Sequence, residues 1–215
     1  MILRRMPKLE SFERIRVRLL SSWIVNSSDT STIIALTSRQ PREGVSTVAA
    51  GLTRALGVSF PGKVLVIDTV PGRRRINELL NTEIKPVTLA ELEGETPLAI
   101  PDMITHHKNF GIDILTLAEA NTSSTLPQRL SKLLDRLRSS YRVIIIDAGA
   151  LSSDGALGWL ARSDYRVLVI DANISTREIL ERQQKELEHS GITLHGSILN
   201  KRKYPVPRFL YWLTR

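Results

Sequence analysis

Two aspartates that end apolar runs are the residues with the clearest chemical potential. Asp68 closes KVLVID at 63–68, and Asp147 closes YRVIIID at 141–147. Ligands of open parallel sheets bind beyond the carboxyl ends of the strands, so we expect these carboxylates to share one edge. There they could coordinate Mg²⁺ and position water for phosphoryl transfer. Either aspartate alone is also a common turn residue, so the prediction rests on the pair.

A loop at 38–47, SRQPREGVST, follows an apolar run at 32–37 and precedes a helical pattern at 46–57. A phosphate-binding loop of the form GxxxxGK[ST] uses glycines for close backbone approach, lysine for phosphate and a hydroxyl for Mg²⁺. Gly44 and Ser46 fit this form, whereas Arg39 replaces the first glycine and Val45 the lysine. A simple turn with a helix cap is the alternative interpretation.

The rest of the pattern predicts the elements that position these residues. Apolar, β-branched runs alternate with helical segments, which is typical of a parallel sheet covered on both faces. We expect an α/β, doubly wound, mostly parallel sheet of about six to seven strands. Predicted strands are 32–37, 63–68, 111–117, 141–147, 165–171 and 192–199, and predicted helices are 46–57, 127–138, 154–162 and 175–189. An amphipathic helix is expected at 8–24, and an irregular excursion with a short helical piece at 88–92 is expected within 83–110.

Composition narrows the function classes. The 215 residues are 42% hydrophobic and 24% charged, as in ordinary folded proteins. The absence of cysteine excludes disulfides and thiolate chemistry, and the four histidines lack metal-ligand spacing, so a metal would be an oxygen-bound ion accompanying a ligand. No apolar stretch reaches the length of a membrane span or signal peptide, which predicts a cytoplasmic protein.

The net charge of +8 is concentrated at the two ends. Residues 1–20 carry six basic and two acidic side chains, and residues 201–215 carry five basic and no acidic ones. The region between them is close to neutral, which argues against a broad DNA-binding face, and no nucleic acid is expected. Basic ends beside apolar residues suit an anionic membrane surface or an acidic partner.

The succession SRQPREGVST, VLVID, YRVIIID, SDYRVLVID and LNKRKYPVP resembles the cytoplasmic domain of bacterial tyrosine kinases, or BY-kinases, and related capsular exopolysaccharide ATPases. These are deviant P-loop ATPases, a group that includes division-site and partitioning ATPases. The resemblance covers nearly all of 8–210 and implies ATP or ADP and Mg²⁺ as ligands. It places phosphate contacts on Arg42, Gly44, Val45, Ser46 and Thr47, the adenine contact on Asn200, and the Mg²⁺ ligands on Ser46, Asp68 and Asp147.

Several motif positions depart from this family. The phosphate loop PGEGKST is here PREGVST, so Arg42 replaces a glycine and Val45 the lysine. In the DxDxR motif Asp68 is present, but Val70 and Gly72 replace the second aspartate and the arginine. The third motif keeps Asp147 and loses its prolines. The resemblance therefore implies a catalytically impaired pseudokinase with weak or absent nucleotide and Mg²⁺ binding, in which Asp68 and Asp147 would be catalytic only if activity remains.

Three segments are expected: a basic amphipathic helix at 1–26, an ATPase-like α/β domain at 27–200, and a basic aromatic tail at 201–215. The family's ExxRxxR pattern between ring subunits falls on Glu10, Glu13 and Arg16, which implies a possible homo-oligomer, although a solvated helix face is an equal alternative. The tail suits docking on the inner membrane face, with packing against the domain as the alternative.

The function implied is regulatory or assembly support of a membrane polysaccharide co-polymerase, the chain-length protein, in exopolysaccharide or capsule synthesis. One alternative is an active ATPase or tyrosine autokinase that uses Arg39 or Arg42 in place of the lysine and modifies Tyr204 or Tyr211. Another alternative is a partitioning-type protein that binds DNA through its basic ends.

Overall fold

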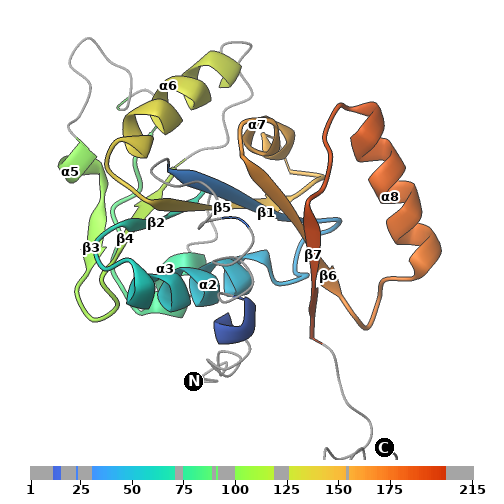
Figure 1. The fold of residues 1–215 in the computed structure, drawn as a ribbon, viewed down its shortest axis with the longest axis horizontal. Coiled ribbons are helices and arrows are strands. Elements are labelled where there is room, and N and C mark those ends of the chain that lie inside the picture. The colour runs from blue at the N-terminus through green and yellow to red at the C-terminus, as the bar shows by residue number, and fades with distance from the viewer. Residues whose placement is uncertain are drawn as a thin grey trace, which may run out of the picture.

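A computed structural model describes residues 12–15, 23, 31–70, 75–88, 91, 100–118, 126–153 and 155–201. Strands and helices alternate through most of this part of the chain (Figure 1). The strands are β1 (Thr32–Ser38), β2 (Val64–Asp68), β3 (Thr105–His107), β4 (Ile112–Thr116), β5 (Val143–Ala150), β6 (Tyr165–Asp171) and β7 (Gly196–Asn200). The helices are α2 (Val45–Ser59), α3 (Arg75–Leu80), α5 (Ile100–Met103), α6 (Leu126–Arg138), α7 (Ala156–Ala161) and α8 (Arg177–His189).

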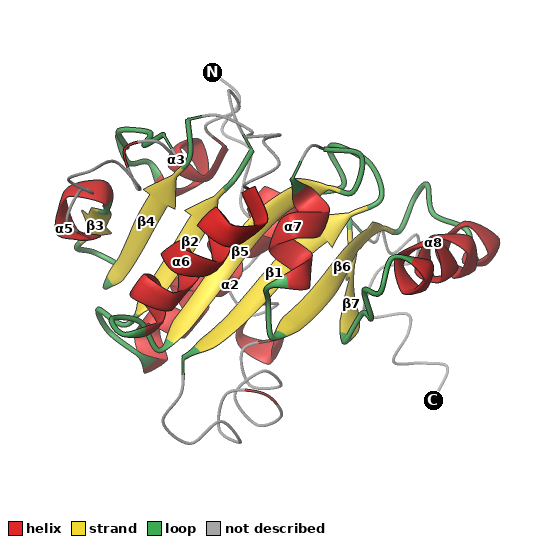
Figure 2. Cartoon of the chain, turned by 90° about the horizontal axis from the view of Figure 1, so that it is seen from above, coloured by secondary structure: helices red, strands yellow, loops and turns green. Residues whose placement is uncertain are grey.

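The seven strands form one sheet in the order β3-β4-β2-β5-β1-β6-β7. Every described pairing is parallel except that of β3 with β4, which is antiparallel. Figure 2 shows β5 and β1 in the middle of the sheet, with β3 and β7 at its edges. The predicted doubly wound, mostly parallel α/β sheet is therefore confirmed.

Helices cover both faces of the sheet, and the buried strands divide their side chains between two cores. Alternate residues of β1 separate in this way: Ile34 and Leu36 join the core beneath α2 and α3, whereas Ile33 and Ala35 join the core beneath α6 and α7. Burial on both sides explains why these strands have continuous Val, Ile and Leu rather than alternating polar residues.

The two ends of the sheet differ most from the sequence-based expectations. The predicted strand at 192–199 begins only at Gly196, where the pairing with β6 starts. Just before it, His195 N donates a hydrogen bond to Arg166 O, and Arg166 N donates one to the His195 ring. The expected irregular excursion at 83–110 contains helix α5 and strand β3. Strand β3 is only three residues long, and two of its residues are histidines. Its sequence therefore lacks the alternation of apolar and polar residues from which a strand is predicted.

Part of the N-terminal segment packs against the α2 face. Residues 12–15 are helical, as predicted, and Phe12 is buried so close to Gly51 that a β-carbon at that glycine would collide with its ring. Trp23 stacks on Tyr165 with ring centres 4.4 Å apart. Within the described residues, no helix combines the length and the apolar character that crossing a membrane requires.

Candidate functional site

A cavity of about 1040 Å³ lies at the carboxyl ends of the central strands. Its wall combines the loop after β1, the start of α2, the residues after β2 and the end of β5. The lining residues are Ser38, Pro41, Arg42, Gly44, Val45, Ser46, Thr47, Thr69, Val70, Arg75, Asp147, Ala148, Gly149, Ala150, Ser153 and Lys201. The structure therefore brings together most of the predicted phosphate-loop residues at the expected edge of the sheet.

The phosphate loop ends in a left-handed turn at Gly44 that leads into α2. Gly44 has φ 106° and precedes the helix without a side-chain cap. The backbone N–H groups of the first turn of this 15-residue helix are thus directed toward the cavity end, an arrangement that favours anions. Arg42 has φ 72°, a left-handed conformation that glycine adopts without strain and arginine does not.

Val45, which replaces the expected lysine, contributes to the hydrophobic core. Its side chain is buried in the cluster beneath α2, although its atoms also form part of the cavity wall. It offers neither charge nor a hydrogen-bond donor to a phosphate. Arg39, a candidate substitute, is not among the residues that line the cavity, whereas Arg42 is.

Asp68 and Asp147 meet as the sequence predicted. They are direct register partners on β2 and β5, and both are buried. Asp68 ends its strand, whereas β5 continues three residues past Asp147 to Ala150. Ser38 pairs with Ala150 there, and its carbonyl oxygen accepts a hydrogen bond from Leu151 N.

Burial makes these carboxyl groups harder to ionise. It raises the pKa of Asp68 to about 7, with the charge of Asp147 as the second cause, and backbone N–H groups of Val70 and Ile76 offset part of the shift. Burial likewise raises the pKa of Asp147, against hydrogen bonds from Ser46 and Gly149. One oxygen of each carboxyl, Oδ2, has no hydrogen-bond partner. Such paired, unsatisfied oxygens beside a serine hydroxyl suit a hard divalent cation.

Val70 stands at the position expected for the second aspartate of the DxDxR motif. It lines the cavity and packs close to Gly149, so that a β-carbon on that glycine would lie 2.8 Å from Val70 Cγ2. Gly72, the other substituted position of this motif, lies outside the described residues, as do Glu10 and Arg16 of the predicted assembly pattern. Glu13 is described, in the helical segment 12–15.

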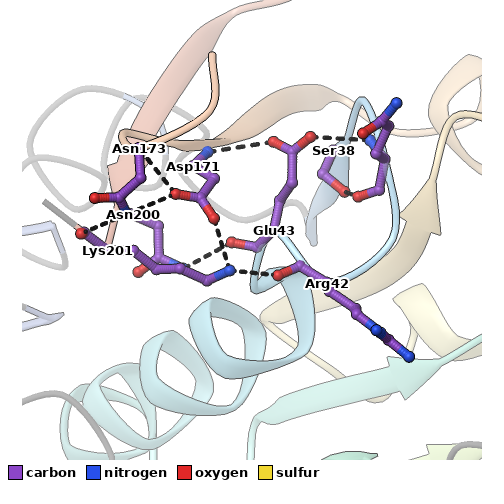
Figure 3. Close-up of polar contacts among 8 residues, drawn as sticks. Ser38, Arg42, Glu43, Asp171, Asn173, Asn200 and Lys201 are labelled. Atoms are coloured by element: carbon purple, nitrogen blue, oxygen red, sulfur yellow. Dashed lines mark hydrogen bonds and ion pairs between the residues drawn. The ribbon is translucent and has the colours of Figure 1, made fainter.

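A buried carboxylate that the sequence analysis did not single out holds the phosphate loop in place. Glu43 is 1% exposed and accepts hydrogen bonds from Gln40 N at 3.0 Å and from Asp171 N at 3.2 Å (Figure 3). Its carbonyl oxygen accepts a hydrogen bond from Asn200 Nδ2 at 2.9 Å. The loop is thus fixed to the ends of β6 and β7, and Asn200, the predicted adenine contact, has its amide directed at the loop backbone.

Two charged cavity residues were also missed: Arg75, at the start of α3, and Lys201, directly after β7. Arg75 pairs with Glu78 at 3.2 Å, and Lys201 pairs with Asp171 at 2.7 Å. A third aspartate at a strand end, Asp171, and a lysine beyond the last strand were the available signals. Among the described residues, no three histidine, cysteine, aspartate or glutamate side chains gather as a metal cluster.

Comparison with known proteins agrees with the motif resemblance. No protein-family model and no curated protein sequence matches the chain. Among solved structures, the kinase domain of Escherichia coli tyrosine kinase ETK is 22% identical with a TM-score of 0.76, over 93% of this chain and 78% of that one. The VpsO kinase domain is 26% identical with a TM-score of 0.71, over 91% and 97% of the two chains.

MinD cell division protein from Aquifex aeolicus shares the fold more distantly. It is 21% identical with a TM-score of 0.64, over 80% of this chain and 70% of that chain. Tyrosine-kinase domains and a cell division protein thus share the overall fold of this chain. The chain therefore has the fold of these kinase domains and of MinD, and its similarity to the VpsO kinase domain makes it BY-kinase-like.

Proposed function

We propose that this chain is a catalytically impaired BY-kinase-like protein that acts by docking in exopolysaccharide or capsule synthesis. The observation that carries the proposal is Val45, which lies in the hydrophobic core at the position where the phosphate loop needs a lysine. Losing a charge that stabilises the transferring phosphoryl group typically costs several kcal/mol, or about 10³-fold in rate. Val70 adds to this loss, because it can neither bind a metal nor accept a proton.

Ligand binding is retained in a weakened form. Ser46, Asp68 and Asp147 would hold Mg²⁺, which fits the two carboxylate oxygens that lack partners. When bound, Mg²⁺ would neutralise charge on the phosphates of ATP or ADP. The first turn of α2 would contact those phosphates through backbone N–H groups, as Gly44, Ser46 and Thr47 line the cavity there. The strained Arg42 and the apolar Val45 limit the affinity.

The catalytic part of the proposal is tested with labelled ATP. The purified protein should transfer no label to itself and release no phosphate above the level of Asp147→Asn, which lacks one of the two paired carboxylates. Label on Tyr204 or Tyr211 that disappears in Asp147→Asn would contradict the proposal and establish an active autokinase.

The docking part concerns the basic aromatic tail, of which only Lys201 is described. We propose that residues 201–215 contact the inner membrane face or a membrane polysaccharide co-polymerase. The segment carries five basic residues and four aromatic ones, and basic residues near an anionic surface contribute about 1 kcal/mol each. This would give a peripherally membrane-associated protein.

Deletion of residues 206–215 tests this surface. The shortened protein should remain folded, because the last described strand ends at Asn200, and it should lose co-sedimentation with anionic vesicles or capture by the co-polymerase. Unchanged association would move the docking surface to the N-terminal segment. Self-association through Glu10, Glu13 and Arg16 is tested with Glu13→Arg, which should lower the oligomer fraction in analytical ultracentrifugation.

A further inference from the structure

Lys201 brings a positive charge to the phosphate loop from the opposite end of the chain. It directly follows β7 with φ 56°, and its side chain crosses to the loop (Figure 3). Its Nζ donates hydrogen bonds to Arg42 O at 2.5 Å and to Asp171 Oδ2 at 2.7 Å. Its Cε lies 4.0 Å from the point where a β-carbon of Gly44 would stand. The amine therefore sits beside the residue that begins α2.

The position of Lys201 differs from those of the other cations around the cavity. The guanidinium of Arg42 points away from the Lys201 amine in Figure 3, and the residue is exposed. Arg75 is held by Glu78 within its own helix. Lys201 alone of these three is fixed by contacts to both the phosphate loop and the end of β6.

We infer that Lys201 is the phosphate-binding cation of this site and supplies the charge that Val45 does not. An ammonium group has three N–H donors, and the contacts to Arg42 O and Asp171 use two of them. Its side chain is 42% exposed and lines the cavity, so a phosphate oxygen can reach the amine. Asp147 and Asp68, with their unpartnered buried oxygens, provide the cation side of the same phosphate site. This inference deepens the proposed function by naming how the weakened site holds an anion.

Asp171 should compete with that anion for Lys201. Burial alone would raise the pKa of Asp171, but hydrogen bonds from Lys201 and Asn173 outweigh burial and lower it, so this group stays ionised at neutral pH. The carboxylate therefore neutralises part of the Lys201 charge. Removing the carboxylate should free the ammonium for phosphate, whereas removing the lysine should weaken phosphate binding. A lysine that only braced the loop would give the same direction of change in both variants, because both break the same ion pair.

The experiment measures binding of Mg-ADP and of inorganic pyrophosphate to the full chain by calorimetry. It compares the natural protein with Lys201→Met, Lys201→Arg, Asp171→Asn and Lys185→Met, which removes the same charge from the exposed surface of α8. Hydrogen bonds to charged groups contribute about 1.5–3 kcal/mol, so Lys201→Met should weaken binding at least about tenfold. Asp171→Asn should strengthen it, Lys201→Arg should retain part of it, and Lys185→Met should leave it within about twofold. Thermal unfolding of each variant shows that it is folded.

Two results would overturn the inference. One is equal affinity of Lys201→Met and the natural protein, and the other is a parallel loss of affinity in Lys201→Met and Asp171→Asn. Failure of the natural protein to bind either probe at millimolar concentration would also overturn it, while leaving the docking proposal intact. Transfer of labelled phosphate from ATP would instead contradict the proposed catalytic impairment, and the comparison of Lys201→Met with Lys185→Met would still decide the role of Lys201.

Discussion

Asp68 and Asp147 face each other as register partners on β2 and β5, and each leaves one carboxylate oxygen without a hydrogen-bond partner. Two neighbouring buried carboxyl groups repel each other when both are ionised. The pair therefore holds a proton at pH values where exposed aspartates have lost theirs. The site is therefore arranged to accept positive charge, either a proton or a metal ion.

Because the pKa of Asp68 is raised in the folded protein, we expect stability to fall as pH rises. The pKa of Asp68 is about 7 in the folded protein and 3.8 as its ordinary value, so between those values the folded state binds more protons than the unfolded state. The free energy of unfolding should therefore decrease from about pH 4 to about pH 7, by at most about 1.4 kcal/mol per pH unit from this group. Urea unfolding of Asp68→Asn across this range should show a flatter profile, and Asp135→Asn on the exposed side of α6 should keep the natural one.

Mg²⁺ should stabilise the ionised pair. The pKa of Asp68 is about 7, so this carboxyl group is mostly ionised at pH 8 and mostly protonated at pH 6, and millimolar Mg²⁺ should raise the melting temperature at pH 8 more than at pH 6. The effect should disappear in Asp68→Asn and Asp147→Asn. An equal shift in these variants, measured by thermal unfolding with and without chelator, would show that Mg²⁺ binds elsewhere.

Replacing Arg42 with glycine should increase the stability of the protein. Its φ of 72° costs an L-residue about 1 kcal/mol that glycine does not pay, although glycine also makes the unfolded chain more flexible. We expect Arg42→Gly to raise the free energy of unfolding by about 0.5 kcal/mol. Arg42→Ala keeps the strained conformation and is the control, so a similar gain in both variants would mean that loss of the charge is responsible.

Restoring the lysine should increase nucleotide affinity and reduce stability. Val45 is buried in the core beneath α2, and placing lysine there removes packing worth about 1–2 kcal/mol. The double variant Arg42→Gly with Val45→Lys should nevertheless bind Mg-ATP more tightly than the natural protein. Calorimetry provides the affinity and urea unfolding the stability. Micromolar binding of Mg-ATP by the natural protein would contradict the degenerate-site interpretation.

Glu43 should be essential for the order of the phosphate loop. Its carboxylate accepts hydrogen bonds from Gln40 N and Asp171 N, so Glu43→Ala should lower the free energy of unfolding by about 3 kcal/mol. Trypsin should then cleave faster after Arg39 and Arg42. Glu43→Gln retains one acceptor and should show a smaller effect. Unchanged cleavage in Glu43→Ala would show that the loop is held by other contacts.

The sequence predicts the central strands well because their burial on both faces demands continuous apolar residues, as in Ile144 and Ile146. It also places Asp68 and Asp147 correctly, since parallel strands bring their carboxyl ends to one edge. Strand β3 escapes prediction because its pairing depends on β4 rather than on its own pattern. Lys201 escapes it because local periodicity carries no information about which distant loop a side chain will reach.

The anchoring of the phosphate loop has a consequence for how the site forms during synthesis. Glu43 contacts Asp171, 128 residues later, and its carbonyl contacts Asn200, 157 residues later. Contacts over such sequence separations form late, because the intervening chain must first be ordered. The loop emerges from the ribosome early but acquires its anchors only when β6 and β7 have been made. A nascent chain that ends before β6 would thus contain β1 to β5 but neither Asp171 nor Asn200, so its phosphate loop would lack both anchors.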